Sequence, residues 1–507
     1  MRSNEIVKIN ENTFNALSNL QKLNLNKNKL TTIKENTFRG LNTLQKLNLN
    51  ENQLQSLEVN VFNGLDNLQE LNLNENKFTK IKEDAFKGLN SLQNLDLSDN
   101  QLIDIELNAF NGLNKLQELN LNTNQLTEIQ ENTFVSLVNL KNLYLGSNHL
   151  TDIKENIFNG LDNLEQLDLS GNQMTIIKEN VFRALKNLQS LSLYGNKLID
   201  IELNAFNGLK NLQEVDLSGN QITNIRENAF DGIISLKQLY LRGNQLTDIR
   251  ENAFQGLTNL QFLYLDGNQL TNIEENAFNG LSSLQELYLG ENKLSNCLQQ
   301  NVFNGLKSLN ILQINANQLT KVKENAFSSL NNLQQLRLFN NKLRVIDENA
   351  FNGLDKLEEL NLSENEITIV KGNAYRGLCS LQKLYLSYNQ LIDIEVNAFN
   401  DLNKLQELEL SNNQLTQIKA NLFKILTDLK QLDLSENKLT EINENCLDDL
   451  KSIEILNLNS NKLAEIKENA FNNLNNLKEV RLFNNQLTEA AQKSLKETFK
   501  HLNLLAL

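Results

Sequence analysis

A pattern of 24 residues recurs from one end of the chain to the other and constrains the fold more than any other feature. A chain of 507 residues would ordinarily form several globular domains. Repetition at a fixed period instead indicates one elongated array in which neighbouring copies bury a shared core. One copy, residues 236–259, places its recurring residues at Leu236, Leu239, Leu241, Asn244, Leu246, Ile249, Phe254 and Leu257. The sequence therefore predicts a single solenoid.

The copies divide the chain into three parts. Residues 1–19 match the back part of a copy, nineteen complete copies span residues 20–476, and residues 477–507 hold a degraded copy with an extension. The copies keep the same spacing except at one point, where the copy that starts at Leu309 comes one residue late. We expect the extra residue between Leu294 and Leu298, beside Cys297.

Each copy predicts one strand followed by a turn. The leucines of L-x-x-L-x-L alternate with period two, so they point into the core while the residues between them point outward. Identical strands stacked in register pair in parallel, about 4.8 Å apart, and form one long sheet. We therefore expect an α/β solenoid with a parallel sheet on its concave face and irregular or short helical turns on its convex face.

Two recurring side chains are interpreted as structural. The asparagine after each strand, for example Asn28 or Asn244, can donate and accept hydrogen bonds and so satisfy backbone groups in the turn. The phenylalanine series, which includes Phe38 and Phe254, is expected to stack as a spine, with Tyr375 and Leu447 as its two substitutions. The remaining abundance of asparagine is interpreted as compositional bias.

The C-terminal segment predicts two further elements. Residues 489–501 have helical spacing with Leu495, Phe499 and Leu502 on one side, which predicts a short amphipathic helix over the last coil. Leu502, Leu505 and Leu507 repeat the spacing of a strand opening. Because both ends fall in mid-repeat, we expect either a closing strand or a chain cut from a longer array, and uncovered ends would favour self-association.

Composition excludes several classes of function. A net charge of -14 and a pI near 5.0 argue against nucleic acid and anionic membranes as partners, since both require a basic face. No apolar run is long enough for a membrane span, and the N-terminus has no apolar core typical of a secretory signal.

Cys297, Cys379 and Cys446 are too scattered for a disulfide framework or zinc site and are expected to be free thiols. With only His149 and His501 as histidines, we expect neither metal nor cofactor.

The pattern L-x-x-L-x-L-x-x-N-x-L-x-x-I-x-x-x-x-F-x-x-L, filled as in residues 236–259, resembles the leucine-rich repeat family. It is similar specifically to the 24-residue "typical" class of Toll-like receptors, Slit-type proteins and variable lymphocyte receptors. It covers essentially the whole chain and implies a horseshoe-shaped solenoid that binds proteins, or sometimes glycans and lipids, on its concave face, usually outside the cell. The chain lacks the proline that follows the isoleucine and the cysteine-rich caps, so a cytoplasmic location stays open.

The residues between the two strand leucines give the best candidate binding site. Tyr240, Tyr264 and Tyr288 occupy this position in three successive copies, and Arg242, Phe262 and Asp266 are expected beside them on the same face. Tyrosine and arginine are enriched at interface hot spots because they bury much area and still form hydrogen bonds. A second cluster consists of Arg337, Phe339, Tyr385 and Tyr388. The alternative is that tyrosine is a good strand residue stacked for stability alone.

The enzyme interpretation has little support. Cys446-Leu447-Asp448 resembles the C-x-D of bacterial ubiquitin ligases that carry leucine-rich repeats, but here the cysteine precedes the spine position and is expected to be buried. No nucleophile with a base, phosphate loop or metal spacing is found. We therefore expect a non-enzymatic recognition module with a protein ligand. The alternative is a structural spacer or adhesion element without a discrete hot spot, to which the asparagine-rich early strands are best suited.

Overall fold

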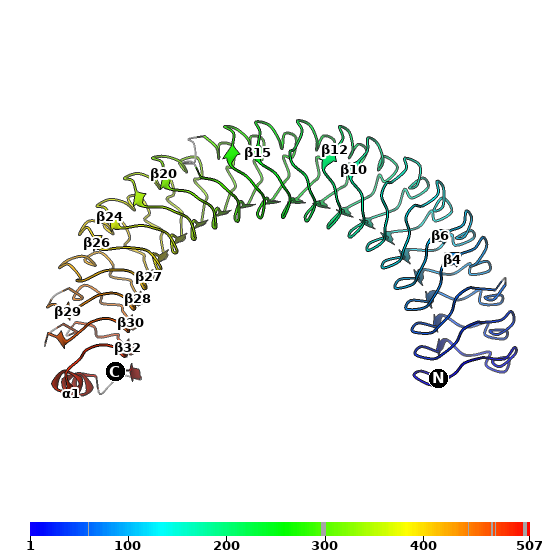
Figure 1. Ribbon diagram of the computed structural model, residues 1–507, viewed down its shortest axis with the longest axis horizontal. Helices are drawn as coiled ribbons and strands as arrows, with labels where there is room; N and C mark the ends of the chain where they lie inside the picture. Colours follow the sequence, from blue (N-terminus) through cyan, green and yellow to red (C-terminus); the bar gives the residue numbers. More distant parts are fainter. Residues whose placement is uncertain are drawn as a thin grey trace. The chain divides into compact units, whose positions relative to one another are not determined.

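The computed structural model describes residues 1–58, 60–295, 301–444, 446–467, 470–471, 473–499 and 504–506. The chain divides into two compact units, which are considered separately. The first unit comprises Met1–Gln245 with Ala253–Leu260, and the second comprises Leu246–Asn252 with Gln261–Leu507. Each unit is a stack of coils, and each coil is one copy of the 24-residue pattern (Figure 1).

In the first unit, a ladder of three-residue strands runs along one side of the coils (Figure 1). Each strand pairs in parallel with the next, so that Leu23 lies opposite Leu47 and Leu191 opposite Val215. The strands are β1 (Lys22–Asn24), β2 (Lys46–Asn48), β3 (Glu70–Asn72), β5 (Asn94–Asp96), β7 (Glu118–Asn120), β8 (Asn142–Tyr144), β9 (Gln166–Asp168), β11 (Ser190–Ser192), β13 (Glu214–Asp216) and β14 (Gln238–Tyr240). The predicted parallel sheet is confirmed.

The second unit continues the same design with its own ladder. Its strands are β16 (Phe262–Tyr264), β18 (Glu286–Tyr288), β19 (Ile311–Gln313), β21 (Gln335–Arg337), β23 (Glu359–Asn361), β25 (Lys383–Tyr385), β27 (Glu407–Glu409), β28 (Gln431–Asp433), β30 (Ile455–Asn457), β32 (Glu479–Arg481) and β33 (Leu504–Ala506). Glu286 pairs with Ile311, 25 residues later, whereas Phe262 pairs with Glu286, 24 residues later. The extra residue is thus accommodated outside the strands; its predicted place beside Cys297 lies outside the described residues.

The other side of the coils consists of turns and two-residue strands. Eight of these short strands form pairs: β4 (Lys80–Ile81) with β6 (Asp104–Ile105), β10 (Ile176–Ile177) with β12 (Asp200–Ile201), β15 (Asp248–Ile249) with β17 (Asn272–Ile273), and β29 (Glu441–Ile442) with β31 (Glu465–Ile466). The other four form one small sheet in the order β20 (Lys321–Val322), β22 (Val345–Ile346), β24 (Ile369–Val370) and β26 (Asp393–Ile394). Within the described residues, the coils hold irregular turns in place of helices. The structure is a parallel-sheet solenoid with very little helix.

The predicted role of the recurring asparagine is confirmed in both units. The buried Asn220 amide donates to the carbonyls of Leu193 and Leu217, each at 3.0 Å, and its Oδ1 accepts from Leu198 N at 3.0 Å. Because Leu193 and Leu198 belong to the preceding coil, one side chain closes its own turn and ties two coils together. A buried backbone group left without such a partner costs about 1–3 kcal/mol.

The abundance of asparagine has a second cause that the sequence interpretation missed. In the segment before the spine residue, Asn36, Asn108 and Asn204 have φ angles of 62°, 64° and 61°. This left-handed conformation is costly for most L-residues but tolerated by asparagine. The left-handed backbone therefore favours asparagine at these positions; Asp84, with a φ angle of 55°, fills the corresponding place in another copy.

The phenylalanine spine is also confirmed. In the first unit, the Phe206 ring stacks between those of Phe182 and Phe230, with centroids 6.5 and 6.0 Å away. In the second unit, Tyr375 takes a phenylalanine place between Phe351 and Phe399, at 6.2 and 6.1 Å. Its hydroxyl is buried and has no hydrogen-bond partner in the part of the chain that the structure describes, and burial raises its pKa.

The C-terminal helix lies where it was predicted. Helix α1 spans Glu489–Thr498, and the Thr488 hydroxyl caps it by accepting from Ala491 N at 3.2 Å. Leu495 and Phe499 are buried, and the Phe499 ring lies 5.2 Å from that of Phe471. Strand β33 then pairs with β32 in parallel, which confirms a final strand around Leu505. Leu502, Leu507 and His501 lie outside the described residues.

Truncation of one spine ring should destabilise the array. We expect Phe206→Ala to lower the free energy of unfolding by about 3–5 kcal/mol, because a fully buried ring is replaced by a cavity. The measurement is chemical denaturation followed by circular dichroism. Phe483→Ala is the matched control, since this ring is 47% exposed, and a comparable loss in both variants would contradict the role of the spine.

Removal of the buried Tyr375 hydroxyl should stabilise the second unit. We expect Tyr375→Phe to raise the free energy of unfolding by about 1–3 kcal/mol, because the desolvation cost of an unpaired hydroxyl disappears while the ring stack remains. Phe351→Tyr, one coil earlier, should have the opposite effect. Equal stability of the wild type and Tyr375→Phe would show that the hydroxyl is satisfied in solution.

Candidate functional site

The candidate residues of the second unit lie on one line across its sheet. We call this line the middle row; it contains the outward-facing residue that follows the central leucine or valine of each strand. Parallel pairing places its members side by side in the order Tyr264, Tyr288, Gln313, Arg337, Asn361, Tyr385, Glu409, Asp433, Asn457 and Arg481. Tyr264 and Tyr288 of the first predicted cluster and Arg337 and Tyr385 of the second are therefore parts of one continuous row.

An aromatic pair stands at the start of this row. The rings of Tyr264 and Tyr288 are stacked, with centroids 4.6 Å apart and an interplanar angle of 15°. Both rings are half-buried, so each presents one part to solvent and one to its neighbour. The predicted contact between these two tyrosines is confirmed, and the pair forms a rigid amphipathic surface of the kind found at interface hot spots.

The hydroxyl of Tyr288 is oriented by a carboxylate of its own strand. It donates a short hydrogen bond to Glu286, which lies two residues earlier on β18. Burial raises the pKa of Tyr288, and the hydrogen bond to Glu286 raises it further, since both disfavour the phenolate. The ring is therefore held across the strand as a neutral phenol.

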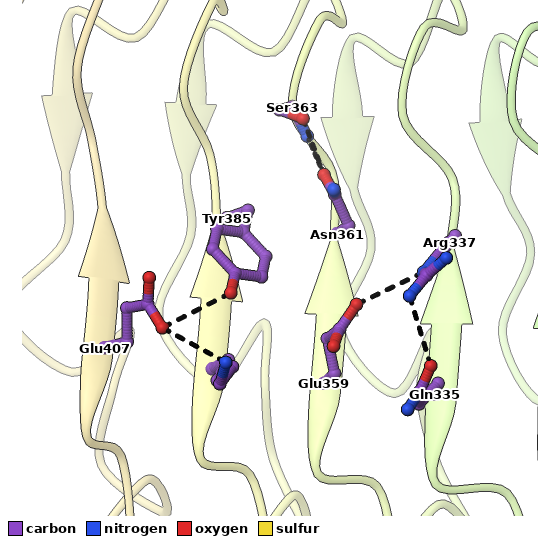
Figure 2. Close-up of polar contacts among 8 residues, drawn as sticks. Gln335, Arg337, Glu359, Asn361, Ser363, Tyr385 and Glu407 are labelled. Carbon is purple, nitrogen blue, oxygen red and sulfur yellow. Dashed lines mark hydrogen bonds and ion pairs between the residues drawn. The ribbon is translucent and has the colours of Figure 1, made fainter.

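Arg337 continues the row two strands further along. Its guanidinium bridges two strands, with Nε donating to Glu359 Oε1 at 3.2 Å and a terminal nitrogen donating to Gln335 Oε1 at 3.3 Å (Figure 2). Asn361 follows on β23 and accepts from the Ser363 hydroxyl at 2.6 Å. The guanidinium is thus held between two strands, and 34% of the Arg337 side chain is exposed.

Tyr385 ends the aromatic part of the row. Its hydroxyl donates to Glu407 Oε2 on the next strand at 3.3 Å (Figure 2), and Lys383 Nζ lies 3.5 Å from the same oxygen. Burial raises the pKa of Tyr385, and the carboxylates of Glu407, Glu359 and Glu409 add to the shift. The pKa of Glu409 is likewise raised, first by burial and then by Glu407 and Asp433. This end of the row is acidic.

The other candidates of the second unit lie beside the row. Phe262 is half-buried on β16 opposite Glu286, and Asp266 is buried in the turn that follows β16. Phe339 is half-buried in the turn after β21. Tyr388 is 60% exposed in the turn after β25, with a φ angle of 53°. Tyr388 and Phe339 therefore lie at the edge of the sheet and not within it.

Tyr240 and Arg242 belong to the first unit. Tyr240 lies opposite Asp216 in the sheet, and its hydroxyl donates to Gln238 Oε1 on the same strand at 2.5 Å. Arg242 is exposed in the turn that follows β14. The three-membered tyrosine ladder thus stays a prediction with respect to Tyr240, while its other two members are in contact.

Sequence reasoning missed the carboxylates that orient the tyrosines. We call the outward-facing residue before the central leucine of each strand the leading row; Glu286, Glu359 and Glu407 belong to it. Glu286 and Glu407 accept from tyrosine hydroxyls, and Glu359 accepts from Arg337. The signal in the sequence was the coincidence of glutamate in the leading row with tyrosine or arginine in the middle row of the same or adjacent copies.

Cys446 does not have the environment of a nucleophile. It is buried, and its thiol donates to the Asn443 carbonyl at 3.0 Å. Burial raises its pKa to about 11, whereas a reactive cysteine needs a lowered pKa. Cys379 and Cys446 are free thiols as expected, and Cys297 lies outside the described residues.

In the part of the chain that the structure describes, no group of three metal-ligating side chains is found and no helix has the length and apolarity of a membrane span.

Two family models match the sequence over most of its length. A model described as leucine rich repeat matches residues 1–54, 42–102, 296–343, 338–391, 380–438 and 403–463. A model described as BspA type leucine rich repeat region matches residues 79–197 and 175–297. The chain belongs to the leucine-rich repeat family. Comparison with curated proteins gives no match.

Solved structures show the same fold for this leucine-rich repeat chain. The TLR13-ssRNA13 complex is similar with a TM-score of 0.67 and 25% identity, over 99% of this chain and 90% of that one. The Drosophila Toll–Spatzle complex is similar with a TM-score of 0.65 and 19% identity, over 96% and 74% of the two chains. A leucine-rich repeat protein of Leptospira interrogans gives 0.51 and 25%, over 99% and 100%.

Removal of the Glu407 charge should lower the pKa of Tyr385. In Glu407→Gln the nearest carboxylate no longer opposes the phenolate, whereas burial, the larger cause of the shift, is retained. We therefore expect the pKa of Tyr385 to fall but to stay above that of a free tyrosine, about 10. NMR titration of carbon-labelled tyrosine measures it. Glu479→Gln, on β32, is the control, and an unchanged Tyr385 pKa in Glu407→Gln would rule out the contact.

Proposed function

We propose that this leucine-rich repeat chain is a non-enzymatic module that binds a protein ligand through the middle row of its second unit. The observation that carries the proposal is the continuity of the row, in which the stacked Tyr264 and Tyr288, the fixed Arg337 and the oriented Tyr385 share one face. Side chains already held in place lose little conformational entropy when a ligand arrives, so more of the contact energy is available for affinity.

The chemistry of the row defines the ligand surface that would fit. The tyrosine pair offers an apolar area with polar edges, which suits an aliphatic or aromatic side chain of the partner. Glu407, Glu409 and Asp433 at the other end favour lysine or arginine of the partner, because a cation relieves the repulsion among these carboxylates. A protein surface that presents an apolar side chain to the tyrosine pair and a lysine or arginine to the carboxylates would complement both parts of the row.

Similar folds support a protein as the ligand. The Toll structure contains Spatzle, and a plant receptor kinase ectodomain of 24% identity and TM-score 0.55 was solved with CASPARIAN STRIP INTEGRITY FACTOR 2. The single-stranded RNA in the TLR13 complex is not carried over, because a net charge of -14 opposes the approach of a phosphate backbone. The buried, protonated Cys446 is consistent with a module that performs no chemistry.

Tyrosine substitution tests this function against a passive spacer. We expect peptides selected from a displayed random library on the full chain to lose about 100-fold or more in affinity for the double variant Tyr264→Ala with Tyr288→Ala, since loss of two hot-spot side chains costs several kcal/mol. Biolayer interferometry measures the affinities. Tyr194→Ala, which removes a 54% exposed tyrosine from a turn, should bind as the wild type does.

The spacer alternative makes a different prediction for the same peptides. If regularity alone is the function, the selected peptides bind the double variant and the wild type equally well, and no position of the middle row stands out. Thermal unfolding of both proteins separates lost binding from lost folding. Equal affinity in a folded double variant would reject the row as the binding site.

A further inference from the structure

A hollow of about 390 Å³ lies on the sheet of the first unit, at its N-terminal strands. One wall is formed by the leading row from Lys22 to Glu118, the other by the middle row from Asn24 to Asp96, and the floor by the strand leucines. We call this hollow the trough. It crosses β1, β2, β3 and β5 and reaches β7 through Glu118. From the sequence, these asparagine-rich strands are interpreted as a passive spacer, but their face has a hollow that can hold a ligand.

The trough is open because its middle-row side chains are short and folded back. Asn48 Oδ1 accepts from Asn50 N at 3.0 Å, and Asn72 Oδ1 accepts from Asn74 N at 2.9 Å. These bonds hold each side chain toward the turn that follows its strand. In the part of the chain that the structure describes, the Nδ2 groups of Asn48 and Asn72 have no hydrogen-bond partner, so they can donate to a ligand.

Other coils show what fills the same space. In β18 the Tyr288 ring turns from the middle row toward the leading row and donates to Glu286. Tyr385 does the same across strands and donates to Glu407. In the trough, Glu70 and Glu118 hold the leading-row places of these glutamates, but asparagine replaces tyrosine. The interval between the rows therefore accommodates a phenol ring, and in the trough no aromatic side chain of the described residues lines it.

The charges along the trough are arranged in order. At the β1 end, Lys22 makes no ion pair with any described residue, and Lys46 is paired with Glu70 in the middle. At the other end lie Asp96, which accepts from the Ser98 hydroxyl at 2.7 Å, and Glu118, which accepts from the Asn94 amide at 3.4 Å; neither forms an ion pair within the described ranges. A ligand that is acidic at one end and basic at the other would complement both ends of the trough.

We propose that the trough binds an extended segment of a protein partner that inserts a tyrosine side chain between the two rows. The phenol would donate to Glu70 or Glu118, as the chain's own tyrosines donate to Glu286 and Glu407. An acidic residue of the segment lies over Lys22 and a basic residue over Asp96 and Glu118. Strands spaced about 4.8 Å apart give a span of about 19 Å from β1 to β7, which about six extended residues cover.

This site is separate from the middle row of the second unit and does not rest on its function. The carboxylates of Asp96 and Glu118 disfavour a phosphate-bearing ligand, and the phenol-sized interval with ordered charges favours a peptide over a neutral sugar chain. The trough would give the module a second recognition surface of different chemistry.

The test uses the full chain and the peptide acetyl-Asp-Ser-Tyr-Ser-Tyr-Lys-amide in calorimetric titration. We expect one binding site and at least about a tenfold loss of affinity in Asn48→Tyr, because the chain's own ring then fills the trough. Tyrosine already occurs at this register in β8 and β25, so the variant should fold, and thermal unfolding verifies it. The matched control is Ser192→Tyr, which adds the same ring in the middle-row place of β11, outside the trough, and should leave the affinity unchanged.

Charge reversal tests the orientation of the segment. Glu118→Lys should weaken binding about tenfold, and replacing the C-terminal lysine of the peptide by glutamate should restore it in this variant alone. Absence of binding to the wild type, or equal affinity for the wild type and Asn48→Tyr, would overturn the proposal. Binding of maltohexaose that Asn48→Tyr abolishes, without peptide binding, would replace the peptide by a glycan and also reject it.

Discussion

The amide of the recurring asparagine is the interaction on which the rest of each unit depends. In the coil of Asn220, one side chain accepts from a backbone N–H of the preceding coil and donates to a carbonyl of each coil. No apolar residue of similar size can do this, and a carboxylate cannot donate. The three-residue strands, further backbone hydrogen bonds between coils such as Gly195 N to Ser218 O at 2.9 Å, and the asparagine ladder together fix the register of neighbouring coils.

This register converts a sequence period into a surface. Because the coils stack in a fixed register, every residue between the strand leucines lies beside its counterpart in the next copy. A continuous row of outward-facing side chains therefore results from the repeat alone. The core, the asparagine ladder and the phenylalanine spine do not depend on which side chains occupy these outward-facing positions. They are therefore free to be tyrosine and arginine in one stretch and asparagine in another, and the chemistry of the face varies while the backbone does not.

Most of the frame could be predicted from the sequence, because it follows from residues that recur. The parallel strands, the stacked spine and the helix at Glu489–Thr498 are all local patterns with one physical solution. The same logic failed for Asn36 and its counterparts, since a left-handed backbone leaves no periodic signature apart from the residue itself. The buried hydroxyl of Tyr375 also gave no signal, as tyrosine and phenylalanine fit the same pattern.

The candidate site was only partly predictable for a different reason. The tyrosines stood out by residue type, and the contact of Tyr264 with Tyr288 followed from register. The direction in which a ring turns depends on its partner in the leading row, as the bonds to Glu286 and Glu407 show, and this is a relation between two positions that vary independently. The trough could not be seen in the sequence at all, because it results from side chains that are short and folded back.

The fixed register between neighbouring coils affects how such a chain can evolve by gain or loss of repeats. A duplication or loss of one complete copy inserts or removes a full turn without disturbing any asparagine bond or ring stack, since each coil contacts only its neighbours. The 25-residue step between Glu286 and Ile311 shows that even a single inserted residue can be accommodated outside the strands. Recombination between copies would therefore reorder the residues of the outward-facing rows while preserving the fold that presents them.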